Sequence, residues 1–183
     1  MASAQMQAAA GQATEILALT LYAEAGTRPV RAIEALAAMV VNRARAALAD
    51  DQARLRFAPG IKWERPLHRA GDAAAADPTP WQREQRHATL WPLLLGPVCR
   101  APFQFPCWNP RHARHAMLRH LPVGDAALAV CRRIAARAAA GALVDPTGGA
   151  THLHLAEELP AWAVGQEALA EIGGLVFYRL GNV

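Results

Sequence analysis

Residues 16–26 read Ile16-Leu-Ala-Leu-Thr-Leu-Tyr-Ala-Glu24-Ala-Gly26, an apolar run that predicts a helix with one carboxylate near its end. We expect this helix to extend from about Ala13 to Ala25, because glycine commonly follows the last helical residue. The negative end of the helix dipole and the apolar neighbours both disfavour a negative charge on Glu24. A carboxylic acid in such surroundings is suited to general acid catalysis, as in glycoside cleavage. An isolated Glu at a helix end is more often simply solvated, so a catalytic role for Glu24 depends on the other motifs in the sequence.

A second helix follows directly. Pro29 suits a first helical position, and apolar residues recur at helical spacing from Val30 to Val41, just before Asn42-Arg43. The two segments together predict a helical hairpin.

The middle and the end of the chain have a different texture. Residues 50–78 show no sustained period and predict an irregular connection. A capping box at Thr79 predicts another helix, which Pro92 should kink or end, and Asp125 should cap a last helix over residues 126–140.

Short strands are predicted after the last helix, at residues 151–155 and 175–180, where β-forming residues follow turn-forming ones. The fold class is therefore α+β, a mainly helical domain with a small β region near the C-terminus. We expect a flexible N-terminus over residues 1–10 and a single domain over residues 11–183.

Composition narrows the functional classes. The chain has 183 residues and a formal net charge of +4, a mild basic bias that suits an anionic partner such as nucleic acid or a cell wall polymer. No window of eighteen apolar residues and no signal-like start is visible, which predicts neither stable membrane insertion nor secretion by a signal peptide. Three cysteines, Cys99, Cys107 and Cys131, are expected to be buried thiols, with a bridge between the first two as the alternative.

Four segments contain side chains that could take part in catalysis or in ligand binding. They are Tyr22-Ala-Glu24-Ala, residues 101–110 with aromatic, amide and proline side chains, Asp145 to His154, and residues 172–179. A rigid loop with Trp and Asn or Gln is a common way to hold sugars, since the ring covers C–H groups and the amides bind hydroxyls. The alternative is a loop that its own aromatic residues anchor to the core.

These segments, in this order and over nearly the whole chain, resemble the cell wall hydrolase family typified by spore cortex-lytic enzymes (the SleB and CwlJ group). The motifs that carry the resemblance are Tyr22-Ala-Glu24-Ala with Val41-Asn42-Arg43, Phe103-Gln104-Phe105 with Trp108-Asn109, Asp145-Pro-Thr-Gly-Gly-Ala-Thr-His152, and Ile172-Gly-Gly through Phe177-Tyr178. The chain departs from the family pattern at Gly26-Thr27-Arg28, Leu153 and Leu175.

The resemblance implies a lysozyme-like fold that cleaves the glycan strands of peptidoglycan at the cell wall, without a cofactor or a metal. It assigns Glu24 as the catalytic acid and places seven residues at the substrate: Tyr22, Gln104, Trp108, Asn109, Thr151, His152 and Tyr178. The absence of a visible signal peptide leaves synthesis in the cytoplasm with an open export or release route, and the oligomeric state is open as well.

A lytic transglycosylase needs only one carboxylate, whereas a muramidase that uses water would normally employ a second. Asp145 is the only second candidate within a motif, and its Asp-Pro-Thr turn favours a structural role for the side chain. We therefore favour the transglycosylase.

Three rival readings remain. His152 and His154 on one face of a strand, together with Asp145, could form the zinc site of a peptidoglycan peptidase. The basic cluster over residues 111–120 could bind nucleic acid, although a solvated face beside the glycan is favoured because no nucleic-acid motif accompanies it. An inactive glycan-binding protein is the third possibility, and the presence of Glu24 argues against it.

Overall fold

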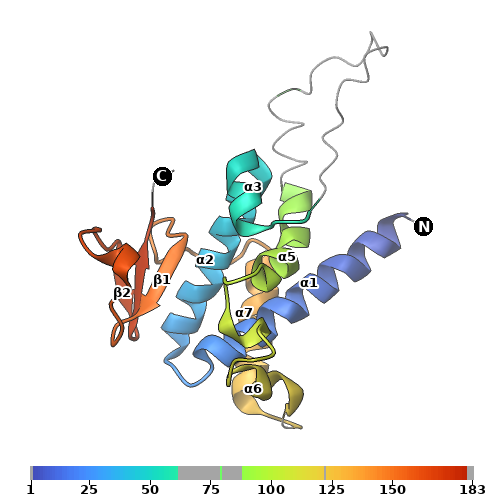
Figure 1. The fold of residues 1–183 in the computed structure, drawn as a ribbon. Helices are drawn as coiled ribbons and strands as arrows, with labels where there is room; N and C mark the ends of the chain where they lie inside the picture. The colour runs from blue at the N-terminus through green and yellow to red at the C-terminus, as the bar shows by residue number, and fades with distance from the viewer. Residues whose placement is uncertain (1, 62–78, 80–87, 122, 181–183) are drawn as a thin grey trace.

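The computed structural model describes residues 2–61, 79, 88–121 and 123–180 of the chain. This part is mainly helical, with one three-stranded antiparallel sheet near the C-terminus (Figure 1). The predicted α+β class is confirmed.

The hairpin predicted from the first two apolar segments consists of α1 (Ala2–Ala25) and α2 (Val30–Ala49). Helix α1 begins at Ala2 rather than near Ala13, because the alanine-rich start favours helix even where nothing packs against it. Residues 4–9 are exposed, and Ala13 is the first buried residue. In Figure 1 the N-terminal part of α1 extends away from the other elements.

The last predicted helix is α7 (Ala126–Ala139), which packs against both α1 and α2. The side chain of its N-cap residue, Asp125, accepts a hydrogen bond of 2.8 Å from the backbone N–H of Leu128, as predicted. Together the three helices bury most of the core, whose fully buried residues include Leu17, Leu21, Leu36 and Met39.

The segment between α2 and α7 contains short elements. Helix α3 (Asp51–Phe57) lies where an irregular connection was expected, and the Asp50 side chain caps it by accepting from the N–H of Ala53. The helix predicted to start at Thr79 lies mostly outside the described residues. Regular α-helix stops near Pro92 as predicted, since the chain forms η1 (Trp91–Leu94) before α5 (Leu95–Arg100).

Two further short elements follow α5. They are η2 (Pro106–Trp108) and α6 (His115–Arg119), which contact each other and the end of α1. They bring the loop between residues 101 and 114 to the C-terminal end of α1.

The sheet consists of β1 (His152–Leu155), β2 (Ala170–Ile172) and β3 (Leu175–Tyr178), in the order β1-β3-β2. Strands β1 and β3 were predicted and β2 was not. The connection from β1 to β2 contains η3 (Ala161–Ala163).

The sheet lies beside α2 (Figure 1). Gly173, in the turn between β2 and β3, has a φ of +58°, and a Cβ at this position would lie 2.8 Å from the Ala32 side chain of α2. Phe177 of β3 is fully buried in the same core as the helices. None of the helices in the described part of the chain is long and apolar enough to cross a membrane.

Candidate active site

Glu24 lies in the last turn of α1, where the sequence placed it. The helix ends at Ala25, and the N–H of Gly26 donates to the carbonyl of Tyr22 over 3.0 Å. A Cβ at Gly26 would lie 2.5 Å from that carbonyl oxygen, so the end of the helix requires glycine. The Glu24 side chain is only 7% exposed.

Two donors from the loop after α5 contact the Glu24 carboxylate. The backbone N–H of Cys107 donates to Oε1 over 2.9 Å, and the Arg114 guanidinium forms an ion pair with Oε2. The sequence argument gave the apolar surroundings and the helix end correctly but omitted this counter-ion. Because Arg114 is 31% exposed, the pair lies at the boundary between protein and solvent.

Glu24 lines a cleft of about 450 Å³. Its walls come from the loop after α5, from the segment before α6, from β1 and the β1–β2 connection, and in part from α2 and β3. Besides Glu24, the lining residues are Leu36, Arg43, Phe103, Gln104, Phe105, Pro106, His112, Arg114, Leu153, His154, Leu155, Glu158, Pro160, Trp162 and Leu175. The cleft thus combines aromatic rings with acidic, basic and amide groups.

Phe103 has an unusual conformation at this cleft. It is the only non-glycine residue with positive φ (+64°) in the described part of the chain, and its side chain is fully exposed. The left-handed conformation costs a non-glycine residue about 1–2 kcal/mol. Packing of the ring within the fold does not offset this cost.

Trp162 of η3 also lines the cleft and is 40% exposed. Its ring forms edge contacts with His154 and Tyr178 at centroid distances of 5.8 and 5.4 Å, and a tilted contact with His152 at 6.0 Å. His154 is fixed in turn, since its Nε2 is 3.0 Å from the Tyr178 hydroxyl and its Nδ1 is 2.7 Å from the Leu155 carbonyl. The exposed face of Trp162 is therefore held rigidly.

Arg43 contributes a buried cation to the cleft lining. Its Nε donates to the carbonyl of Thr151 over 2.6 Å, and its guanidinium lies over the rings of Phe57 and Phe105. Burial lowers the pKa of Arg43 to about 10. Its Nη1 is buried and has no hydrogen-bond partner among the described residues.

The predicted site residues divide into two groups. Gln104 lines the same cleft as Glu24, and its Nε2 donates to the carbonyl of Arg56 over 3.3 Å. Tyr22 does not line the cleft: its hydroxyl donates to Asp125 over 3.2 Å, and burial together with this contact raises the pKa of the phenol. Trp108 and Asn109 also lie outside the lining.

The contacts of Trp108 and Asn109 are local. The indole N–H of Trp108 donates to the buried hydroxyl of Thr20 over 3.0 Å, and Arg100 covers its ring. Asn109 accepts from the N–H of Arg111 in a turn. These contacts agree with a loop anchored to the core, which was the alternative reading of this segment.

The remaining predicted residues lie near the sheet. Thr151 lines a separate pocket of about 590 Å³ beside α3, and its hydroxyl is 2.9 Å from Nδ1 of His152. His152 packs between Phe57 and Trp162, and burial with two nearby arginines lowers its pKa to about 4. Tyr178 supports His154 from behind the cleft.

Asp145 has a structural role. Its carboxylate accepts from the Asn42 amide over 2.9 Å, from both the N–H and the hydroxyl of Thr147, and from the N–H of Gly149. Burial acts to raise its pKa, but these hydrogen bonds outweigh burial and lower it. Asp145 is not among the residues that line the cleft.

The proposed zinc triad is not assembled. Within the described ranges, no group of three or more His, Cys, Asp or Glu residues has the arrangement of a metal site. Both ring nitrogens of His154 are within hydrogen-bond distance of protein partners, the Tyr178 hydroxyl and the Leu155 carbonyl. The oxygens of Asp145 accept hydrogen bonds from the Asn42 amide and from the turn that follows Asp145. Cys99, Cys107 and Cys131 are free and buried, as expected.

Part of the basic cluster is turned toward the cleft. His112 and Arg114 line it, and Nδ1 of His115 is 2.9 Å from the Cys107 carbonyl. The sequence gave no reason to separate Arg114 from its neighbours. Glu158, Phe103 and Trp162 are further lining residues that the predicted set omitted.

In comparisons with known proteins, no family model, curated protein or solved structure matches this chain.

Proposed function

We propose that this protein cleaves the glycan strands of peptidoglycan, as a lysozyme-like lytic transglycosylase of the cell wall hydrolase type that its motifs resemble. The observation that carries the proposal is the Glu24 carboxyl group, nearly buried at the end of α1 and lining a cleft of about 450 Å³ with amide and aromatic side chains. A cleft of this volume lies within the usual range of ligand sites.

In the proposed reaction, Glu24 protonates the oxygen of the bond between N-acetylmuramic acid and N-acetylglucosamine, and that bond breaks. The resulting carboxylate then accepts the proton of the muramyl 6-hydroxyl as this oxygen closes a 1,6-anhydro ring. The acid is thereby regenerated. One carboxyl group therefore serves first as acid and then as base.

Arg114 has to move before the first step, because its guanidinium occupies Glu24 Oε2 in the free protein. Its partial exposure makes this movement feasible without opening the core. The N–H of Cys107 can keep its bond to Oε1 and hold the carboxyl group in place.

A hydrolytic variant of the proposal has a specific candidate. Glu158 lines the same cleft and could activate water as a second carboxylate, a role for which Asp145 is unsuited. The products distinguish the two reactions, since hydrolysis gives reducing ends and transglycosylation gives anhydro ends.

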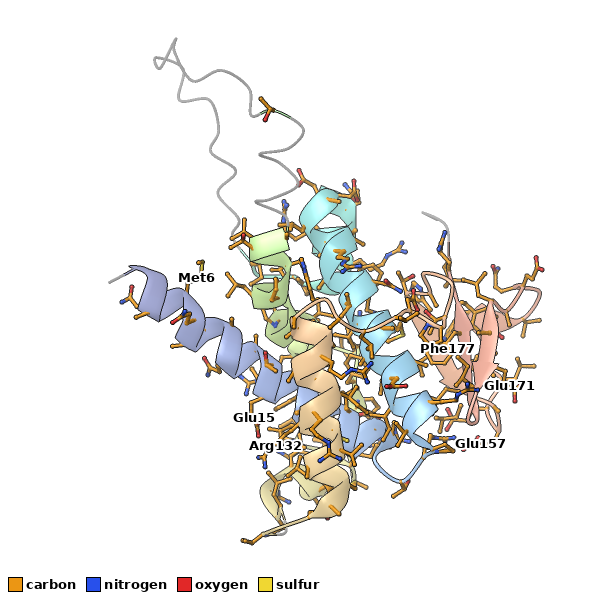
Figure 2. All side chains as sticks on the ribbon, turned by 180° about the vertical axis from the view of Figure 1, so that it is seen from behind. Met6, Glu15, Arg132, Glu157, Glu171 and Phe177 are labelled. Atoms are coloured by element: carbon orange, nitrogen blue, oxygen red, sulfur yellow. The ribbon has the colours of Figure 1, made fainter. Side chains whose placement is uncertain are left out.

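The test is digestion of purified peptidoglycan with the wild type, Glu24→Gln and Glu15→Gln, followed by mass spectrometry of the soluble products. Glu15 is the matched control because it lies on the same helix, where it pairs with Arg132 at 2.6 Å outside the cleft (Figure 2). We expect anhydro-muropeptides from the wild type and from Glu15→Gln, and a rate at least about 100-fold lower from Glu24→Gln. Peptide release that survives in Glu24→Gln and stops with chelator would overturn the proposal.

A further inference from the structure

Phe103 and Trp162 are exposed aromatic residues at the cleft that contains Glu24, and they come from different parts of the chain. Phe103 belongs to the loop after α5, and Trp162 belongs to η3 in the connection from β1 to β2. Each has one feature that favours a role in ligand binding.

For Phe103 this feature is the backbone. An observed strained conformation at a site suggests a functional constraint, because selection would otherwise favour glycine or asparagine at a φ of +64°. The conformation holds a large apolar ring in solvent at the edge of the cleft. A ligand that covers this ring would gain binding free energy, because the exposed apolar surface would be removed from water.

For Trp162 the feature is rigidity. Three aromatic side chains from β1 and β3 surround its ring, and the two hydrogen bonds of His154 fix one of them. A face that is already ordered loses little conformational entropy when it binds a flat partner. Aromatic faces and the C–H faces of sugar rings are complementary, while neighbouring Gln104 and Glu158 can bind hydroxyl or amide groups.

We propose that Phe103 and Trp162 are two sugar-stacking positions of the cleft and that they set its affinity for a chain of N-acetylated hexoses. This inference rests on the proposed function for its substrate class and deepens it. Neither residue touches the reacting bond in this arrangement, so both are binding residues and Glu24 is the catalytic one.

The experiment measures binding and cleavage separately with the full chain. Calorimetry with two probes, chitohexaose and peptide-free glycan strands of peptidoglycan, is done on Phe103→Ala, Trp162→Ala and the aromatic replacements Phe103→Tyr and Trp162→Phe. Glu24→Gln is included so that affinity for the glycan strands can be measured without turnover. Leu169→Ala is the matched control, since Leu169 is exposed on the surface but does not line the cleft.

Each alanine variant is expected to weaken binding of the glycan strands about 3- to 10-fold, and the aromatic replacements and Leu169→Ala to change it less than about 2-fold. In cleavage assays the alanine variants should raise KM more than they lower kcat. The melting temperature of Phe103→Ala should not fall, because the exposed ring supports no packing.

The outcomes separate this inference from the proposed function. Unchanged affinity in both alanine variants, together with cleavage that depends on Glu24, would overturn the inference alone. Sugar binding that both alanine variants weaken, together with no cleavage by the wild type, would overturn the proposed function and keep the inference. Absence of binding to both probes by the wild type and by Glu24→Gln would overturn the inference as well.

Discussion

The replacement Asp145→Ala separates a structural carboxylate from a catalytic one. Asp145 accepts four hydrogen bonds, and one donor is the hydroxyl of Thr147, a residue that is fully buried. A net contribution of about 0.5–1.5 kcal/mol per hydrogen bond gives a loss of about 2–4 kcal/mol of unfolding free energy, allowing for partial replacement by water. Asp145→Asn keeps one acceptor oxygen and should lose about half as much.

The assay is urea denaturation followed by circular dichroism at neutral pH, with Glu171→Ala as the control. Glu171 is an exposed carboxylate on β2 (Figure 2), and its replacement should change the unfolding free energy by less than about 0.5 kcal/mol. Because the folded pKa of Asp145 is lowered, the stabilisation is present at neutral pH and is lost as the pH falls from the ordinary carboxyl pKa through the lower pKa of the folded state. The difference between wild type and Asp145→Asn should therefore shrink in acid.

Cleavage of peptidoglycan is then measured at a temperature at which both proteins are folded. Asp145→Asn should retain wild-type kcat, since the side chain does not line the cleft. A variant with unchanged stability and lost activity would refute the reasoning and would make Asp145 a participant in the chemistry.

Three other predictions concern charge and burial. The pKa of His152 is lowered from 6.5 to about 4, so His152 takes up a proton at a higher pH in the unfolded chain than in the folded protein. After allowance for partial exposure, the unfolding free energy should therefore fall by about 1–2 kcal/mol between pH 6.5 and pH 4. His152→Gln should remove this part of the pH dependence of the unfolding free energy measured in denaturation curves. Arg114→Gln should destabilise the fold by about 1–3 kcal/mol because it leaves the Glu24 carboxylate without its counter-ion, and Arg114→Lys should recover part of this loss in the same assay. Native protein should react slowly with a thiol reagent at pH 8 and show three reactive thiols only in denaturant. The reason is that burial raises the pKa of Cys99 to about 12, raises that of Cys131 to about 11, and raises that of Cys107 as well. Fast labelling of the native protein would contradict the burial of these thiols.

Local patterns predicted the elements that are long or clearly capped. The hairpin, the cap at Asp125 and strands β1 and β3 follow from periodicity and turn chemistry, which neighbouring residues determine. The predicted start of α1 near Ala13 was wrong, because alanine residues continue the helix beyond the region that packs against other elements. Helix α3 and strand β2 are too short for a periodic signal, and packing against α2 and β3 stabilises them.

The cleft was harder to predict than the fold. Glu24 and Gln104 were found because each belongs to a distinctive motif, and both line it. Trp108 illustrates the limit of this reasoning, because residue type suggested a sugar platform and the indole instead binds Thr20 in the helical core. Trp162 had a usable signal, a tryptophan directly after Pro160-Ala161 in a loop, but only tertiary packing shows that its ring borders the cleft.

The pairing of Glu24 with Arg114 joins residues that are 90 positions apart, so no sequence period could reveal it. The pairing also bears on the order of the proposed reaction. The guanidinium has to leave Oε2 before the first half of the proposed cycle, in which Glu24 donates a proton to the glycosidic oxygen. Under the proposed function, a sugar chain bound at Phe103 and Trp162 would occupy the same cleft as Arg114, so substrate binding itself would displace the guanidinium from Glu24. Free protein and substrate complex should thus differ chiefly in the position of Arg114, while the bond from the N–H of Cys107 keeps Glu24 in place through both halves.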